Sequence, residues 1–210
     1  SVTYGNKFKN GYLGSDLSGT GWGLKFDFII VHESGHEWFA NSITNKDAAD
    51  MWIHEGFTSY AENLFLDYHY GKRASADYVI GTRKRIKNDK AIIGDYNVNN
   101  TGSSDMYYKA ANLIHMLRQL TDDDSKWRMI LRKLNNNFFH KVVTTHEIEK
   151  FLSDEIGLDL KPLFNQYLRD TRIPVFEYKI LEGKMYYRWT NVVKNFKMPI
   201  EIIIDNSKNW

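Results

Sequence analysis

The sequence predicts a mainly α-helical chain that ends in a short β segment. Seven stretches between residues 24 and 169 carry helical patterns, separated by glycine, proline or polar turns. After Pro174 the pattern changes to the alternation that is typical of strands. The chain has 210 residues, 42% of them hydrophobic, which is ordinary for a soluble globular chain of one domain or slightly more.

Local signals support the ends of several of these helices. Gly71 is a C-terminal stop for the second helix, and Ser104 or Asp105 would cap the fourth. Thr144 is followed by Glu147 in a capping-box pattern, and Pro162 suits the first turn of the last helix. The expected helices span residues 24–42, 47–70, 72–86, 105–120, 122–140, 144–155 and 159–169.

The remaining segments are loops and strands. Residues 1–23 form a glycine-rich loop with room for a short strand at Val2–Tyr4, and residues 87–104 form a loop long enough to line a cleft. The final segment holds the alternating runs V-F-E-Y-K-I, K-M-Y-Y-R-W-T-N-V-V and P-I-E-I-I-I-D, too few residues for a sheet core of their own. We therefore predict a partial helical domain over 1–172 and the truncated start of a β-rich domain over 173–210.

A metal-binding pattern lies in the first helix. His32, Glu33 and His36 form an H-E-x-x-H motif, and residues four apart share one face of a helix. Two imidazoles placed in this way can occupy two corners of a tetrahedral Zn²⁺ site. Glu33 follows the first histidine directly, so it could hold and deprotonate water at the open position of the metal.

A third protein ligand must come from elsewhere in the chain. The sequence has no cysteine, which leaves another histidine or a carboxylate. Glu55 follows His36 after a polar stretch that can turn the chain, near the start of the second helix. Because helices joined by a short loop tend to pack antiparallel, Glu55 would return over the two histidines. Two histidines and one glutamate form a known catalytic zinc set.

The residues around this motif resemble the gluzincin aminopeptidases, the zinc peptidase family of aminopeptidase N. That family reads H-E-x-x-H-x-W-F-x-N-x-x-T, followed by W-x-x-E-G-F-A-x-Y-x-E. The resemblance implies the α-rich half of a thermolysin-like catalytic domain, zinc ligands at His32, His36 and Glu55, and a general base at Glu33. The further residues that match are Trp38, Phe39, Asn41, Thr44, Trp52, Gly56, Phe57, Tyr60 and Glu62.

The resemblance extends to the fourth helix. The family has Y-x-K-G there, and its tyrosine stabilises the oxyanion. This sequence has Y-Y-K-A, so Tyr107 takes the position of that tyrosine and Ala110 replaces the glycine. Tyr108 is the second choice, and two core tyrosines are the alternative. Glu62 either orients a zinc ligand or pairs with a basic neighbour, and His54 is a candidate to orient Glu55.

The implied function is a zinc aminopeptidase that removes N-terminal residues from a peptide substrate. In the family, a G-x-M-E segment that grips the substrate amine precedes the V-T-Y-G-N stretch; this sequence starts after it, so we expect a fragment whose partner is the remainder of a parent polypeptide. Two alternatives stay open. One is a zinc endopeptidase on the same metal set, and the other is a non-catalytic, metallopeptidase-like fragment.

The composition gives no support for several other classes of function. The formal net charge of +2 gives no case for nucleic-acid binding, and the basic face of residues 72–86 is expected to be solvated. The sequence has no run long enough to span a membrane. The absence of cysteine is compatible with the cytoplasm, a bacterial envelope compartment or secretion.

Overall fold

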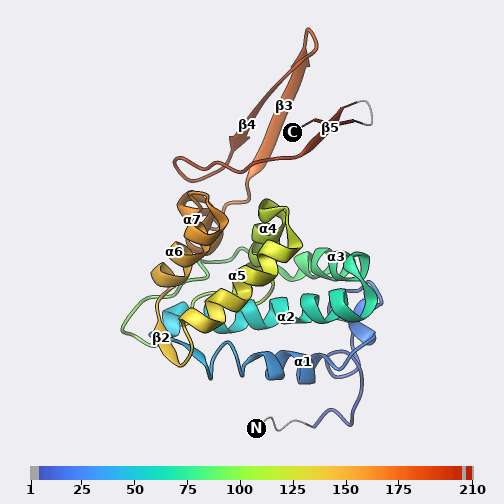
Figure 1. Ribbon diagram of the computed structural model, residues 1–210, viewed down its shortest axis with the longest axis vertical. Helices are drawn as coiled ribbons and strands as arrows, with labels where there is room; N and C mark the ends of the chain where they lie inside the picture. The colour runs from blue at the N-terminus through green and yellow to red at the C-terminus, as the bar shows by residue number, and fades with distance from the viewer. Residues whose placement is uncertain (1–4, 205–206, 210) are drawn as a thin grey trace.

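The computed structural model describes residues 5–204 and 207–209, so the expected strand at Val2–Tyr4 lies outside the described residues. A body of packed helices occupies most of the chain, and a β-hairpin projects from it (Figure 1). The predicted mainly α fold with a short β segment is therefore confirmed. None of the helices in the described ranges has the length and hydropathy that crossing a bilayer requires.

Each of the seven predicted helices is present, with ends that differ by a few residues in most cases. They are α1 (Phe28–Gly35), α2 (Trp52–Tyr70), α3 (Lys72–Thr82), α4 (Tyr108–Thr121), α5 (Asp124–Asn137), α6 (Thr145–Ile156) and α7 (Lys161–Arg169). Short 3-10 turns are η1 (Trp22–Leu24), η2 (Ala48–Asp50), η3 (Arg83–Arg85) and η4 (Ser104–Met106).

The first helix is much shorter than the predicted range of 24–42. Asp27 caps its start, because its side chain accepts a hydrogen bond from the backbone N–H of Ile30, and the helix ends at Gly35. Beyond it the chain closes in wide turns, with the N–H of Asn41 donating to the carbonyl of His36 at 3.0 Å. The apolar residues there have helical spacing, but Trp38 is largely exposed, and Phe39 stacks on Phe57 of the core from a turn rather than from a helix.

The cap predicted for the fourth helix was wrong, whereas other caps are confirmed. Ser103, rather than Ser104 or Asp105, begins the turn η4 by accepting from the N–H of Asp105. The chain then bends, and α4 begins only at Tyr108. The capping box of Thr144 and its glutamate is present, and so is the stop at Gly71, whose φ of 88° suits glycine.

Two three-residue strands within the helical body were not predicted. β1 (Ile43–Asn45) pairs in parallel with β2 (Lys141–Val143), so the segment after α1 lies beside the segment after α5. Such short strands show no alternation, and their pairing depends on residues almost 100 positions apart. This pairing fixes the chain between the two histidines and Glu55.

The β segment begins as expected. β3 (Val175–Leu181) and β4 (Lys184–Thr190) form an antiparallel hairpin, although the second strand ends before the predicted N-V-V. β5 (Ile202–Ile204) falls in the third predicted run and pairs with β6 (Ser207–Asn209). The proposed domain boundary between residues 172 and 173 stays a prediction.

Helix α2 lies at the centre of the helical body. Its first half buries Trp52, Phe57 and Tyr60, and it packs against α1 on one side and α4 on another (Figure 1). Glycine allows both approaches: a Cβ at Gly35 would lie 3.0 Å from the methyl of Thr58, and one at Gly56 would lie 2.7 Å from another Cβ. The close contact of α1 with α2 brings the predicted ligands together.

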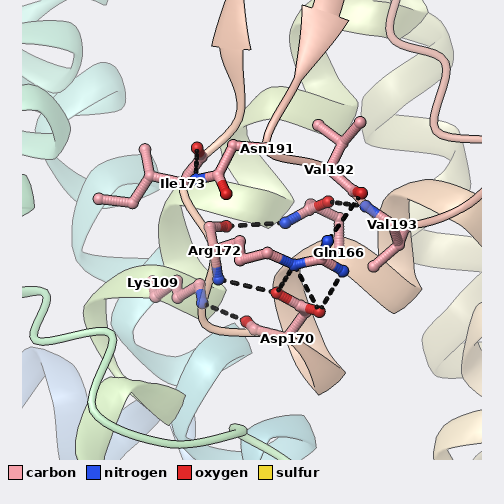
Figure 2. A network of polar contacts seen from close by, with 8 residues as sticks. All are labelled: Lys109, Gln166, Asp170, Arg172, Ile173, Asn191, Val192 and Val193. Carbon is pink, nitrogen blue, oxygen red and sulfur yellow. Dashed lines mark hydrogen bonds and ion pairs between the residues drawn. The ribbon is translucent and has the colours of Figure 1, made fainter.

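A polar network ties the β segment to the helical body (Figure 2). Gln166 of α7 is buried; its amide donates to the carbonyl of Arg172 at 2.7 Å, and its oxygen accepts from the N–H of Val193 at 2.8 Å. Lys109 of α4 donates to the carbonyl of Asp170 at 3.1 Å, and Arg172 pairs with the carboxylate of the same aspartate. The hairpin is thus anchored to α4 and α7.

Candidate metal centre

The three predicted ligands converge between α1 and α2. His32 lies in α1, His36 follows its last turn, and Glu55 lies in the first turn of α2. The Oε2 atom of Glu55 is 3.2 Å from Nε2 of His32 and 3.6 Å from Nε2 of His36. One ligand atom from each side chain lies within 4.8 Å of the others, and this is the one such group among the residues that the structure describes.

The distances from Glu55 to the two histidines fit a zinc ion. Zinc–nitrogen and zinc–oxygen bonds of about 2.1 Å in a tetrahedron put ligand atoms roughly 3.4 Å apart. The two distances to Glu55 lie close to this value. Two imidazole nitrogens and one carboxylate oxygen are also a donor set that zinc accepts in catalytic sites.

A second carboxylate orients the ring of His32. Its Nδ1 lies 2.9 Å from Oε1 of Glu62, so the Nδ1–H donates to this carboxylate, and Nε2 on the opposite side of the ring points toward Glu55. The hydroxyl of Tyr78 donates to Oε2 of Glu62 at 2.6 Å. Burial raises the pKa of Glu62, and the hydrogen bonds from His32 and Tyr78 oppose this. Of the two roles left open for Glu62, the contact with a candidate ligand is the one observed.

Backbone and hydroxyl oxygens orient His36. Its Nδ1 donates to the carbonyl of Phe39 at 3.1 Å and lies 3.2 Å from the hydroxyl of Thr58. Its Nε2 is therefore available toward Glu55. The turn that shortened α1 supplies this carbonyl, so the irregular geometry after His36 helps to form the site.

The surroundings of His32 favour positive charge. Burial alone would lower its pKa, but the hydrogen bonds and charges of Glu55 and Glu62 raise the pKa of His32 to about 9. Both carboxylates lie within 3.2 Å of the ring nitrogens. A divalent cation can replace this proton, which is what a zinc site requires.

Tyr107, rather than Tyr108, lies on the side of the candidate ligands. The ring centroids of Tyr107 and His32 are 6.0 Å apart. Burial, followed by the carboxylates of Glu55 and Glu33, raises the pKa of Tyr107 to about 12, so its phenol stays protonated and can donate. For Tyr108 the main causes of a raised pKa are burial and Glu62.

His54 has a different partner from the one suggested by its neighbour Glu55. Its Nε2 accepts a hydrogen bond from the N–H of Asn45 at 2.8 Å, which links strand β1 to the first turn of α2. Burial, together with the charge of His36, lowers the pKa of His54 to about 4, so the ring is neutral at pH 7. His54 thus fixes the start of the helix that carries Glu55.

Sequence reasoning missed Tyr78, Thr58 and Phe28. Phe28 stacks on the ring of His32 with centroids 5.3 Å apart. Helical spacing puts Phe28 one turn before His32 and could have suggested this contact. Tyr78 and Thr58 reach the site only because α3 and α1 pack on α2, which no local pattern reveals.

The chain is similar in sequence to a known protein family and to several characterised proteins. The model of the peptidase family M1 domain matches residues 24–167. Leukotriene A-4 hydrolase from Xenopus laevis is 29% identical over 137 residues, which cover 59% of this chain and 22% of that protein. Human aminopeptidase B is 23% identical over 177 residues, covering 78% of this chain and 25% of that protein. The chain spans about a quarter of the length of these relatives.

Solved structures share the fold. An M1 zinc metallopeptidase from Deinococcus radiodurans superposes with a TM-score of 0.59 at 22% identity, over 71% of this chain and 34% of that one. Aminopeptidase A from Legionella pneumophila, solved with aspartic acid, gives a TM-score of 0.61 at 15% identity, over 84% of this chain and 21% of that one. The helical body is therefore an arrangement found in these enzymes.

Proposed function

The chain belongs to peptidase family M1, and from that premise we propose that it carries the catalytic zinc site of an aminopeptidase that removes N-terminal residues from peptides. The observation that supports this most directly is the convergence of His32, His36 and Glu55, each within reach of one zinc ion. The oriented histidine rings add to it, because both present Nε2 to the same point.

In this proposal His32, His36 and Glu55 hold the zinc ion through Nε2, Nε2 and Oε2. When bound, zinc supplies a Lewis acid that polarises the scissile carbonyl and makes water more acidic. Glu62 keeps the proton of His32 on Nδ1, and the carbonyl of Phe39 does the same for His36. These contacts keep both Nε2 lone pairs available.

Two further side chains take part in the chemistry. Glu33 is half-buried on α1 directly after His32, where its carboxylate can accept a proton from the attacking water and pass it to the leaving amine. Tyr107 keeps its proton at neutral pH and can donate a hydrogen bond to the oxygen that becomes negative.

The relatives favour an aminopeptidase over the two alternatives. Human aminopeptidase B and the Legionella enzyme both carry that activity in their names, which supports amino-terminal cleavage over endopeptidase activity. A non-catalytic module is disfavoured because the ligands, the base and the tyrosine are all present. The chain covers about a quarter of the length of these relatives. The substrate of the whole protein is therefore proposed here as well.

The substitution Glu33→Gln tests the proposal. It keeps the shape of the side chain but removes the base, so we expect zinc content to stay the same while hydrolysis of an aminoacyl anilide falls about 100-fold or more. Glu37→Gln, an exposed position in the same segment, is the matched control. Undiminished hydrolysis by Glu33→Gln would contradict the mechanism. Equal cleavage of an N-acetylated substrate would favour the endopeptidase.

A further inference from the structure

Glu62 is a buried carboxylate that depends on its hydrogen bonds. Its side chain is 1% exposed, and among the residues that the structure describes its one ion-pair partner is His32. Burying a carboxylate costs free energy unless hydrogen bonds replace those that it makes to water. Here Nδ1 of His32 lies 2.9 Å from Oε1, and the hydroxyl of Tyr78 donates to Oε2 at 2.6 Å. Each oxygen of the carboxylate therefore has its own donor.

The hydroxyl of Tyr78 reaches Glu62 from α3, and packing holds its ring in place. Tyr78 is also 1% exposed and belongs to a small apolar cluster with Phe26 and Leu66. The ring centroids of Tyr78 and Phe26 are 5.8 Å apart at an interplanar angle of 65°. Because a closely packed ring cannot shift without displacing its neighbours, the hydroxyl has a fixed position. Phe26 lies just before α1, so this cluster also joins α3 to the helix that carries His32.

The contacts form a chain from α3 to the candidate zinc site. The hydrogen bond from Tyr78 fixes one oxygen of Glu62, and this fixes the rotation of the carboxylate. That rotation decides where Oε1 lies beside Nδ1 of His32. On the opposite side of the ring, Nε2 of His32 lies 3.2 Å from Oε2 of Glu55. A rotated carboxylate would therefore turn the ring and move Nε2 away from the point that it shares with Glu55 and His36.

We propose that Tyr78 is a positioning residue of the zinc site, which acts on His32 through Glu62 and raises the affinity for zinc. This inference rests on the proposed function, because the position of His32 matters to zinc only if the three ligands hold the ion. Without the hydroxyl, Oε2 of Glu62 is a buried charged oxygen that has lost its donor, which is costly. The carboxylate then turns toward another donor, and His32 loses the fixed acceptor that orients its ring.

The test compares the zinc affinity of the wild type and Tyr78→Phe, measured by competition with a chelator of known affinity. The substitution keeps the packed ring and removes only the hydroxyl. We expect the affinity to fall about three- to tenfold, less than for loss of the carboxylate itself, because the acceptor of His32 is still present.

Tyr60→Phe is the matched control. Tyr60 is also 1% exposed, and its hydroxyl accepts a hydrogen bond from Nε1 of Trp127 at 3.0 Å. This variant loses a buried hydrogen bond that does not involve Glu62, so its zinc affinity should equal that of the wild type.

Two further measurements separate positioning from a general loss of stability. Tyr78→Phe made in the Glu62→Gln background should change the zinc affinity less than about twofold, because residues that act through one another are not additive. Co²⁺ bound in place of zinc has visible absorption bands that depend on the geometry of its ligands. Tyr78→Phe should shift these bands relative to the wild type, and Tyr60→Phe should not.

The outcomes separate this inference from the proposed function. A wild type that binds no zinc removes both. A wild type that binds zinc, with the same or a higher affinity in Tyr78→Phe, overturns the positioning role and leaves the zinc site intact. An equal loss in Tyr60→Phe, an equal loss in the Glu62→Gln background, or unshifted Co²⁺ bands also overturn it. A loss confined to Tyr78→Phe with Glu62 present, together with shifted Co²⁺ bands, supports it.

Discussion

Glu62 is a buried carboxylate with a different partner on each oxygen, His32 on one and Tyr78 on the other. Its charge fixes the tautomer of His32 and makes the ring a better ligand. We expect Glu62→Gln to weaken zinc binding 10- to 100-fold, roughly the loss seen when such outer partners are removed. Competition with a chelator of known affinity measures this change.

Glu177→Gln is the control for this prediction, because that carboxylate lies on the exposed hairpin and pairs with Arg188. It should leave the affinity for zinc unchanged. Equal affinities for the wild type and Glu62→Gln would show that the hydrogen bond to His32 has no part in metal binding.

His115 gives the stability of the fold a dependence on pH. Its Nδ1 is buried without a hydrogen-bond partner, and burial, then the charges of Arg118 and Arg83, lowers its pKa to about 4. Between about pH 6.5 and pH 4 the unfolded chain therefore binds a proton that the folded chain does not. Stability falls as the pH falls through this range, and the contribution is constant above it. We expect this group to make the fold about 2 kcal/mol less stable at pH 5 than at pH 7.

Urea unfolding of the wild type and His115→Gln at both pH values measures this contribution. Other groups titrate in the same range, so the relevant quantity is the difference between the two proteins. The wild type should lose about 2 kcal/mol more than the variant on going from pH 7 to pH 5. An identical loss in both would mean that the folded chain accommodates a protonated His115.

At the scale of helices, the contact between α2 and α4 depends on a small residue on each side. A Cβ added at Gly56 would lie 2.7 Å from the Cβ of Ala110, which is the position where the resembled family has glycine. Gly56→Ala should therefore reduce the free energy of unfolding by about 1–3 kcal/mol. Denaturant unfolding measures this, and Gly5→Ala, where a Cβ meets nothing within 4 Å, is the control.

The double variant Gly56→Ala with Ala110→Gly moves the methyl group across the same contact. It should recover most of the lost stability, because only one Cβ again lies between the helices. If the double variant is as unstable as Gly56→Ala alone, the loss comes from another neighbour, such as the carbonyl of Met106 at 3.3 Å.

Helices were predictable from the sequence where the pattern was long and a local signal marked an end. The capping box at Thr144 and the stop at Gly71 are examples, since both depend on residues within four positions of each other. The end of α1 was not predictable, because the apolar spacing continues past His36, where the chain leaves the helix for wide turns. The pairing of β1 with β2 joins distant segments, and no local sequence pattern in either segment indicates it.

The candidate site was likewise predictable where it depends on local spacing and not where it depends on tertiary packing. The i, i+4 spacing of His32 and His36 is a property of one helix, and the return of Glu55 follows from an antiparallel pair of helices. Tyr107 was indicated only by resemblance. Tyr78 could not be found from the sequence, because its contact with Glu62 requires α3 to pack on α2.

At the scale of the molecule, Gln166 joins the helical body to the β segment. Its two hydrogen bonds reach the linker before β3 and the strand exit after β4 (Figure 2). Gln166→Ala removes the hydrogen bonds to the N–H of Val193 and to the carbonyl of Arg172, at a cost of about 1 kcal/mol for each bond. We expect faster proteolysis within residues 173–204 while the helical body persists.

Limited proteolysis with mass spectrometry measures this change, and Gln119→Ala, an exposed residue of α4, is the control. Cleavage that spreads equally over helices and hairpin would mean that Gln166 stabilises the whole body rather than the attachment of the β segment. The hairpin exposes Tyr178, Ile180 and Tyr187, as a two-stranded sheet without a core must.

The most direct test of the zinc site is the metal content of the wild type and of Glu55→Gln, measured by elemental analysis after dialysis. Glu55 supplies one of three ligand atoms, so its substitution should remove most of the affinity. We predict one zinc ion per chain in the wild type and close to none in Glu55→Gln, with Glu177→Gln unchanged. A wild type without zinc, or a Glu55→Gln variant that retains it fully, would contradict the site of His32, His36 and Glu55.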